Sequence, residues 1–309
     1  MDPPLVSAGE RAYTLEGVRD GVRADGRGAV GLRPVSLDAG LLPHCFGSAR
    51  CVVGAGTSAS ATGGATEAVC GIKAEVRKPR AAAPGRGWVE AGVEIGGALL
   101  AAHGGSERRA AREAETRLTA ALQAALDGAV DGALGIADGA FCWVLQVDVT
   151  LLADDGGALA AVSLAAALAL RDCRLPPVTH LPGEAGFDDD FEVDGALDAA
   201  VPLAGAADAV PVCVAVSALG GALVADCTPD EAACAEAALS FAVDRKGRVA
   251  AVVDKRGAAM RVGALEKALA VAGRVAAAWH RGLDGAVAAS GAAGGSADAP
   301  ARRLGFLAE

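Results

Sequence analysis

Two periodicities of hydrophobic residues run along the chain. Between residues 35 and 94, short β-prone runs are separated by glycines, and in residues 142–152 polar side chains alternate with apolar ones. This alternation predicts strands with one buried face. Across residues 106–126 the spacing becomes helical, because leucines recur every four residues from Leu118 onward. Two further helices are predicted, at residues 5–20 and 159–171.

The second half of the chain repeats this order of strands followed by a helix. Strands are predicted across residues 210–225 and 237–253, and a helix from Val262 to about Leu283. Strands followed by a helix, twice, indicate an α+β protein of two similar packed lobes. A loop with Pro176, Pro177 and acidic residues 188–190 separates the halves, and the Ala-, Gly-, Ser- and Pro-rich end is typical of disorder. We therefore divide the chain into a helical extension, two lobes and a disordered or extended tail: residues 1–21, 22–185, 195–289 and 290–309.

Composition limits the class of protein. Aromatic residues make up 3% of the 309 residues, so the core is expected to pack Ala, Val and Leu. The longest apolar stretch, residues 209–225, contains Pro211, Gly220 and Gly221, and is too broken to span a bilayer. The first residues lack the basic and apolar regions of a signal peptide. We expect a soluble, intracellular protein with no membrane partner.

Charge and metal-binding residue types exclude several functions. A formal net charge of −10 argues against a stand-alone nucleic-acid-binding protein, although it is compatible with a local basic patch. The eight cysteines form no CxxC pair and the four histidines are far apart in the sequence, which disfavours a zinc site or a disulfide framework. The acidic residues 188–190 could hold a divalent ion, but acidic runs in loops are usually solvated. We expect no metal and no cofactor.

One glycine-rich segment matches a dinucleotide-binding fingerprint. Residues 54–59 have the spacing, but the fingerprint needs a following helix whose free N–H groups meet the phosphates. Residues 60–74 are small, glycine-rich and then strand-like, so a turn between strands is the preferred interpretation. A GxSxG nucleophile elbow is also missing from the sequence.

Four segments occur in an order that carries a family resemblance: residues 22–27 (VRADGR), 32–35 (LRPV), 47–54 (GSARCVVG) and 147–170, which contains a DGG turn. Together they resemble the RNase PH family, from about Val22 to Leu283. The resemblance implies the RNase PH fold, which is ribosomal protein S5 domain 2-like and has two similar lobes of mixed sheet with helices. Within the family, residues 142–149 and 304–307 are most similar to a non-catalytic subunit of the eukaryotic RNA exosome ring.

The same resemblance allows a test for catalysis. Active members of the family use inorganic phosphate to shorten RNA from its 3′ end, and an arginine after the DGG turn holds the phosphate. Here that position is Leu159, which cannot bind phosphate. Alignment on Asp226 and strand 239–243 places the two expected catalytic carboxylates at Ala232 and Ala238. The resemblance therefore implies an inactive subunit. The alternatives are an active phosphate-dependent 3′–5′ exoribonuclease, if the register differs, and an unrelated α+β binding protein.

Basic residues persist outside these positions. Arg108, Arg109 and Arg112 begin the helix that ends at Leu126, where the family resemblance places the RNA path, and a solvated helix start is the competing interpretation. A second basic group could contact RNA or a neighbouring subunit, or remain solvated: Arg77, Lys78, Arg80 and Arg86.

The resemblance also implies partners and a location. The partners are single-stranded RNA, other RNase PH-like exosome ring subunits in a hexameric ring, and S1/KH-type cap subunits. The implied role is 3′-to-5′ RNA processing and decay, including ribosomal RNA maturation, in the nucleus, the nucleolus and the cytoplasm.

Overall fold

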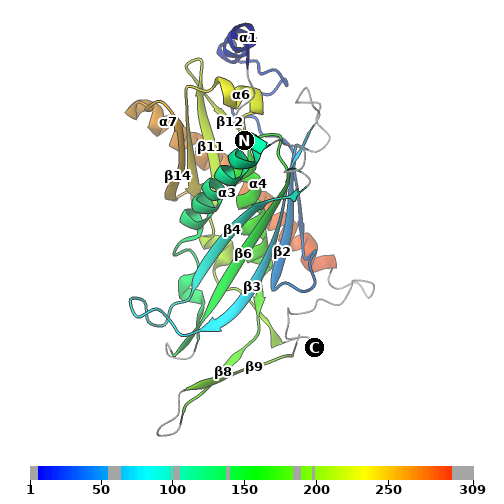
Figure 1. Cartoon of the computed structure of the whole chain (residues 1–309), viewed down its shortest axis with the longest axis vertical. Helices are drawn as coiled ribbons and strands as arrows, with labels where there is room; N and C mark the ends of the chain where they lie inside the picture. Colours follow the sequence, from blue (N-terminus) through cyan, green and yellow to red (C-terminus); the bar gives the residue numbers. More distant parts are fainter. Residues whose placement is uncertain are drawn as a thin grey trace.

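The computed structural model describes most of the chain: residues 6–54, 64–97, 99, 105–136, 140–183, 189–196 and 199–293. Its described part consists of two main β-sheets, with helices between them and beside them (Figure 1). The predicted α+β class is confirmed.

Six strands from the first half form one sheet: β1 (Val35–Ala39), β2 (Gly47–Val53), β3 (Thr66–Arg77), β4 (Trp88–Ile95), β5 (Gly135–Ile136) and β6 (Phe141–Ala153). Their order is β1-β2-β3-β6-β4, with β5 paired to β6. Neighbouring strands are antiparallel except β4 and β6, which are parallel. The predicted alternation in β6 is present, because Val147 and Val149 are buried while Asp148 between them is exposed.

Four strands from the second half form the other sheet: β11 (Val212–Leu219), β12 (Ala222–Ala225), β13 (Ala237–Val243) and β14 (Val249–Gly257). All neighbouring pairs are antiparallel, in the order β12-β11-β13-β14. Most of the buried residues of this sheet are alanine and valine, and Phe241 is its largest fully buried residue. The small-residue core that the composition predicts is therefore present.

The helices that frame the two sheets are α1 (Ala8–Arg19), α3 (Gly105–Leu126), α4 (Ala158–Asp172), α5 (Ala206–Ala209), α6 (Pro229–Cys234) and α7 (Val262–Ala293), together with the 3-10 helix η1 (Asp131–Ala133). α4 packs against β2 and β3 of the first sheet and against β11 of the second. α7 contacts β11 and also β1. The two lobes therefore share one hydrophobic core, which explains why every α4 residue from Leu159 to Asp172 is buried.

α3 lies beside the first sheet and contacts β4, its edge strand, and it also contacts β14, the edge strand of the second sheet (Figure 1). Near the N-terminus, α1 begins with a capping box between Ser7 and Glu10, and the helix packs against α6. Only Val18 of α1 is buried, in a small satellite cluster with Leu219, Val224 and Cys234.

Two short strand pairs complete the connection between the lobes: β7 (Arg174–Leu175) with β10 (Val201–Pro202), and β8 (Val178–Leu181) with β9 (Asp190–Val193). The β8–β9 pair extends away from the body as an arm (Figure 1). Its inner face is held by Phe141 of β6, whose ring meets Phe191 at 5.1 Å and His180 at 5.8 Å between centroids. The segment that the sequence predicts to be a loop is therefore partly a β-hairpin.

Two apolar segments lie inside the subunit. Residues 209–225 contain β11, an inner strand of the second sheet, and β12, which is at one edge of that sheet. Residues 162–170, an uncharged helix, are covered on both sides by the sheets. α7 continues to Ala293, ten residues beyond the predicted end of this helix near Leu283, and Ala286 and Val287 still pack against the core. Residues 294–309 of the predicted tail lie outside the described residues. No helix in the described ranges is long and apolar enough to cross a membrane.

Candidate functional site

The DGG turn connects β6 to α4 in a backbone conformation that only glycine adopts readily. Gly156 and Gly157 have φ values of +86° and +78°. Thr66 of β3 holds the turn, because its hydroxyl accepts a hydrogen bond from the Asp155 amide at 2.9 Å and donates one to the Gly156 carbonyl at 2.7 Å. A Cβ on Gly156 would lie 3.1 Å from the Cys227 carbonyl oxygen, so the turn is pressed against the start of α6. First and second lobes meet at this point.

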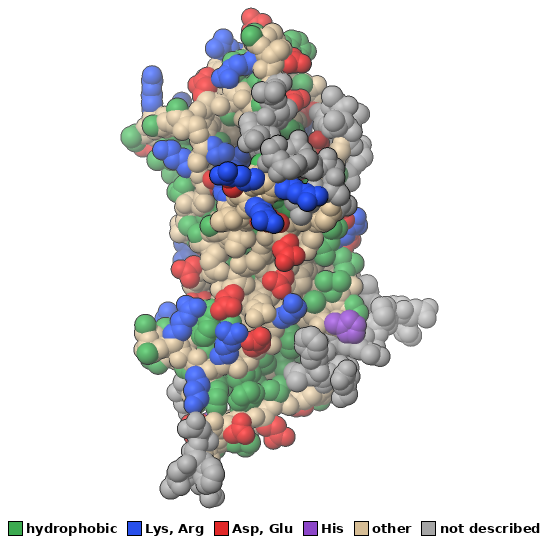
Figure 2. Space-filling model, in the orientation of Figure 1, with side chains coloured by type: hydrophobic (Ala, Val, Ile, Leu, Met, Phe, Trp, Pro, Cys, Tyr) green, Lys and Arg blue, Asp and Glu red, His purple; other side chains and the backbone are tan. Residues whose placement is uncertain are grey.

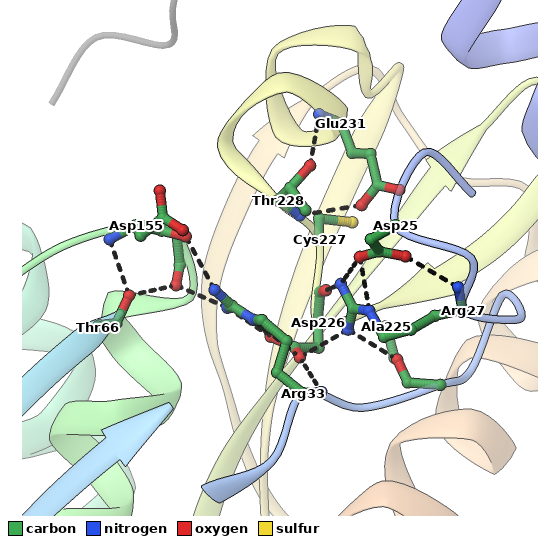
Figure 3. A network of polar contacts seen from close by, with 12 residues as sticks. Asp25, Arg27, Arg33, Thr66, Asp155, Ala225, Asp226, Cys227, Thr228 and Glu231 are labelled. Carbon is green, nitrogen blue, oxygen red and sulfur yellow. Dashed lines mark hydrogen bonds and ion pairs between the residues drawn. The ribbon is translucent and has the colours of Figure 1, made fainter. Parts of the chain in front are cut away.

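Arg33 and Asp226 join the two lobes at this turn (Figure 3). The Arg33 guanidinium donates to Asp226 Oδ1 at 2.6 Å through Nη2, to the Asp155 carbonyl at 2.9 Å and to the Gly156 carbonyl at 2.8 Å. The Arg33 amide also donates to Asp226 Oδ2 at 2.7 Å. One buried arginine therefore ties a second-lobe carboxylate to the backbone of the DGG turn. The Asp226 carboxylate neutralises the arginine's charge.

Two more arginines of the N-terminal signature complete this network. Arg27 Nη1 donates to Asp226 Oδ2 at 2.9 Å, and Arg23 pairs with Glu231 of α6 at a site where both side chains are almost fully buried. Asp226 is the one non-glycine residue with positive φ, +50°, among the described residues. Burial alone would raise the pKa of the Asp226 carboxyl, but the hydrogen bonds and charge of Arg33, with the charge of Arg27, hold that pKa below its usual range. Asp226 is therefore a charged structural anchor.

The three positions predicted to lack catalytic groups lie on three different elements. Leu159 is in the first turn of α4 and is 7% exposed. Ala232 is exposed on α6, the helix whose beginning touches Gly156. Ala238 lies on β13 opposite Arg256 of β14. All three positions carry apolar side chains, and that they correspond to catalytic positions remains what the family resemblance implies.

The nearby arginines share a single carboxylate. Arg256 Nε lies 3.2 Å from Asp254 Oδ2, and Arg117 Nε of α3 lies 3.9 Å from the same oxygen. Burial, followed by the charge of Arg256, lowers the pKa of the Arg117 guanidinium. Asp254 therefore compensates cations that otherwise repel each other.

The predicted RNA-binding arginines of α3 lie elsewhere, on the surface. Arg108, Arg109 and Arg112 are exposed, and Figure 2 shows basic side chains over the N-terminal half of α3. Arg109 Nε meets Glu113 Oε1 at 3.0 Å, an exposed pair one turn apart. Among the described residues, no carboxylate lies within ion-pair distance of Arg108 or Arg112. These side chains are open to a ligand or to solvent.

The basic loop at residues 77–86 is partly engaged within the chain. Arg77 Nη2 lies 2.6 Å from Glu75 Oε2, and the Arg80 guanidinium stacks over the Trp88 ring at 4.2 Å. The backbone amide of Gly87, the residue that follows the loop, donates a hydrogen bond to the Asp131 carbonyl at 3.2 Å. The loop is therefore anchored at its C-terminal end by η1.

Metal-binding residue types are dispersed. No group of three or more His, Cys, Asp or Glu side chains in the described segments could hold a metal ion. Of the acidic run, Asp188 lies outside the described residues, while Asp189 Oδ2 is 3.3 Å from His180 Nε2. All eight cysteines are free, and burial raises the pKa of the Cys51 and Cys213 thiols to about 12.

Two protein-family models match the sequence of this chain. The model of the 3′ exoribonuclease family, domain 1 (RNase PH), matches residues 31–176, and that of domain 2 matches residues 209–275. The chain belongs to the RNase PH family. The two matched ranges contain all strands of the two main sheets, and the predicted RNase PH fold is confirmed.

Relatives within the RNase PH family are exosome components. The chain is 26% identical over 265 residues to the exosome complex component Rrp42 of Pyrococcus abyssi, covering 84% of this chain and 88% of that protein. It is 29% identical over 258 residues to the exosome complex component rrp42 of Schizosaccharomyces pombe, covering 79% and 80%. A solved structure of an Archaeoglobus fulgidus exosome with RNA bound to the active site has a TM-score of 0.62 at 24% identity, over 86% of this chain and 94% of that chain; at this identity the likeness shows the fold.

Sequence reasoning missed what the signature arginines do. They were recognised as part of a family pattern, whereas the structure shows Arg23, Arg27 and Arg33 as buried partners of second-lobe carboxylates. Asp226 stands between Ala225 and Cys227, and Glu231 between Asp230 and Ala232, so the sequence around the partners gives no signal for this role. The pairing partners are about two hundred residues apart, and no local spacing connects them.

Proposed function

We propose that this RNase PH-family chain is a non-catalytic structural and RNA-path subunit of an RNA exosome ring. In this role it supports 3′-to-5′ RNA processing and decay, including ribosomal RNA maturation. Relatives in an archaeon and in a yeast carry the name of an exosome component, which supports the assignment to that complex. The active phosphate-dependent exoribonuclease is the disfavoured alternative.

One observation carries the non-catalytic part of the proposal. Around the DGG turn, the position for a phosphate-holding arginine is the buried side chain of Leu159. Arg33 does reach this turn, but its guanidinium is paired with Asp226 and also donates to two backbone carbonyls. Phosphorolysis requires a cationic site, because an anionic phosphate must approach an anionic diester. Leu159 cannot supply that charge, and the Arg33 charge is already paired with Asp226.

The test is a phosphorolysis assay. The purified chain is incubated with a single-stranded oligonucleotide, inorganic phosphate and Mg²⁺, and nucleoside diphosphates are measured. We expect no release above that of a Leu159→Asp variant, in which a negative charge repels phosphate. Phosphate-dependent release by the native chain that Leu159→Asp abolishes would establish an active enzyme and overturn the non-catalytic assignment.

The partners follow from the same assignment. We place the chain next to other RNase PH-like subunits in a hexameric ring, capped by S1/KH-type subunits, in the nucleus, the nucleolus and the cytoplasm. Co-expression with an RNase PH-like sister subunit should give a defined heterodimer or ring on size-exclusion chromatography, and the chain alone should self-associate or aggregate. A stable monomer at micromolar concentration, with a melting temperature that ignores the sister subunit, would contradict this pairing.

The RNA path is assigned to α3. Arg108, Arg109 and Arg112 are exposed at the beginning of the helix, and basic groups there oppose the helix dipole. An anionic ligand at this position would offset the unfavourable placement, and the RNA backbone is such a ligand. Arg77, Lys78, Arg80 and Arg86 are not assigned to RNA, because Arg77 and Arg80 are engaged within the chain.

A further inference from the structure

α3 is attached to the edge of the first sheet by side chains. Glu115 Oε1 accepts a hydrogen bond from the Ile95 amide at 2.9 Å, and Thr119 Oγ1 accepts one from the Val93 amide at 3.0 Å. Gln123 accepts one from the Ala91 amide at 2.8 Å and donates one to the Val89 carbonyl at 3.0 Å. We call these contacts the α3–β4 ladder: Glu115, Thr119 and Gln123 on α3, and Val89, Ala91, Val93 and Ile95 on β4.

The ladder forms because the spacing of its side chains along α3 nearly equals the spacing of its backbone amides along β4. The three α3 residues are four apart, which is about 6.0 Å along a helix. Their amide partners on β4 are two apart, which is about 6.6 Å along a strand. The free edge of a sheet alternates outward-facing amides at this spacing, so one helical stripe can satisfy several of them in succession. Side chains thus replace the missing neighbour strand, and they define both the rotation and the axial position of α3.

The same stripe continues toward the N-terminus of α3. Arg108 is seven residues before Glu115, and Arg112 is seven residues before Thr119. Residues seven apart occupy the same face of a helix. We propose that Glu115, Thr119 and Gln123 are positioning residues, which direct Arg108 and Arg112 along the line of the β4 edge toward the RNA backbone. This inference rests on the proposed RNA contact of α3.

A ligand-binding role for the ladder itself is the weaker interpretation. Ala91, Glu115, Thr116, Thr119, Ala120 and Gln123 line a shallow depression of about 480 Å³. Its Glu115, Thr119 and Gln123 side chains already bond to β4, and the rest of the lining is small. The polar groups of this depression therefore act on the protein's own backbone.

The experiment removes the ladder and leaves the arginines in place. Thr119→Val with Gln123→Met deletes the hydrogen bonds to Ala91 and Val93 at nearly constant side-chain size. The matched control is Thr116→Val, because the Thr116 hydroxyl bonds to the Arg112 carbonyl within α3 and not to β4. Thr119→Ser is the rescue variant, because it keeps the hydroxyl. Each variant is prepared in the ring co-expressed with its sister subunits.

Two measurements are made on each variant. Hydrogen exchange of the Ala91 and Val93 amides reports the ladder, and fluorescence anisotropy with an oligoadenylate at several salt concentrations reports RNA contacts. We expect the double variant to exchange faster and to lose up to about 1.4 from the slope of log affinity against log salt, because two single-strand phosphate contacts contribute about 0.7 each. Thr116→Val and Thr119→Ser should match the native ring in both measurements.

The results separate this inference from the function beneath it. Faster exchange with an unchanged salt slope would overturn the positioning role. Arg108→Gln with Arg112→Gln, made in parallel, tests the RNA contact directly. If that variant keeps the native slope, α3 does not bind RNA and the positioning role falls with it. If it reduces the slope while the ladder variant does not, only the positioning role is wrong. Should the double variant fail to assemble, Thr119→Val alone provides the same comparison.

Discussion

Arginines in two regions of this molecule have opposite surroundings. At the junction of the lobes, Arg23, Arg27 and Arg33 are mostly buried and paired with Glu231 and Asp226. At the beginning of α3, the arginines are exposed, and the one ion pair among them is an open i,i+4 contact. A buried charge requires ion-pair and hydrogen-bond partners within the protein, whereas an exposed charge is solvated by water and stays available to a ligand. Arginine content therefore does not identify an RNA surface; the state of each guanidinium does.

The largest effect is expected from removing the carboxylate of the junction. Asp226→Asn keeps the shape and tolerates the positive φ, but it leaves Arg33 and Arg27 without their shared counter-charge. Breaking a buried pair from one side costs about 3–5 kcal/mol, which we expect as the loss in free energy of unfolding by urea denaturation.

The control is an exposed aspartate in the same protein. Asp148 lies 3.3 Å from Lys73, with both side chains more than half exposed. Asp148→Asn should change the free energy of unfolding by less than about 1 kcal/mol. Equal effects of the two substitutions would show that the junction is not a structural anchor.

The exposed region should respond in RNA binding and not in stability. Changing Arg108, Arg109 and Arg112 together to Glu in the assembled ring should weaken binding of single-stranded RNA. It should also flatten the salt dependence by about 2, because three contacts contribute about 0.7 each. The measurement is anisotropy across a salt series. An unchanged slope would return these residues to the interpretation of a solvated helix start.

A buried histidine sharpens the comparison, because its charge state can be titrated. His280 of α7 is neutral by chemistry: Nδ1 accepts from Arg171 at 2.6 Å, and Nε2 donates to the Val243 carbonyl at 3.1 Å. Burial, opposed by the bond to Val243 and helped by the charge of Arg171, lowers the pKa of this imidazole from 6.5.

The sign of the pH effect follows from that direction. The unfolded chain binds a proton at His280 below about pH 6.5, and the folded chain binds it only at lower pH. Stability is therefore complete above pH 6.5 and falls below it, by at most about 1.4 kcal/mol per pH unit. Urea denaturation between pH 7.5 and 5 measures this slope. His280→Gln should remove the contribution, and a slope that persists in this variant would assign it to other groups.

The smallest effect is expected at the exposed ion pair. Arg109→Ala removes the contact with Glu113 on the surface of α3. An i,i+4 pair of this exposure contributes about 0.3–0.5 kcal/mol, and salt screens it. Thermal unfolding in low and high salt should show a small loss that vanishes at high salt. A loss above about 2 kcal/mol would mean that Arg109 has a structural partner of its own.

Local pattern was enough to predict most of the elements. Alternation in β6 and the four-residue leucine repeat of α3 reflect backbone geometry, so they are visible in any window of the sequence. The glycines of the DGG turn and the family signature likewise identify the fold. The assignment of Leu159, Ala232 and Ala238 to catalytic positions came from the family resemblance and stays a prediction.

Tertiary structure alone decided what each charged or apolar segment faces. Arg33 and Asp226 are 193 residues apart, and nothing near either residue indicates the other. An uncharged helix such as α4 is compatible with a partner surface or with burial inside the lobe, and the structure shows that it packs against β2, β3 and β11. Hydrophobic periodicity reports that a face is buried and not what buries it, because the burial energy depends on area and not on the identity of the neighbour. For the same reason the α3–β4 ladder could not be read from Glu115, Thr119 and Gln123: polar residues on a helix face acquire their role only when a strand edge lies opposite them.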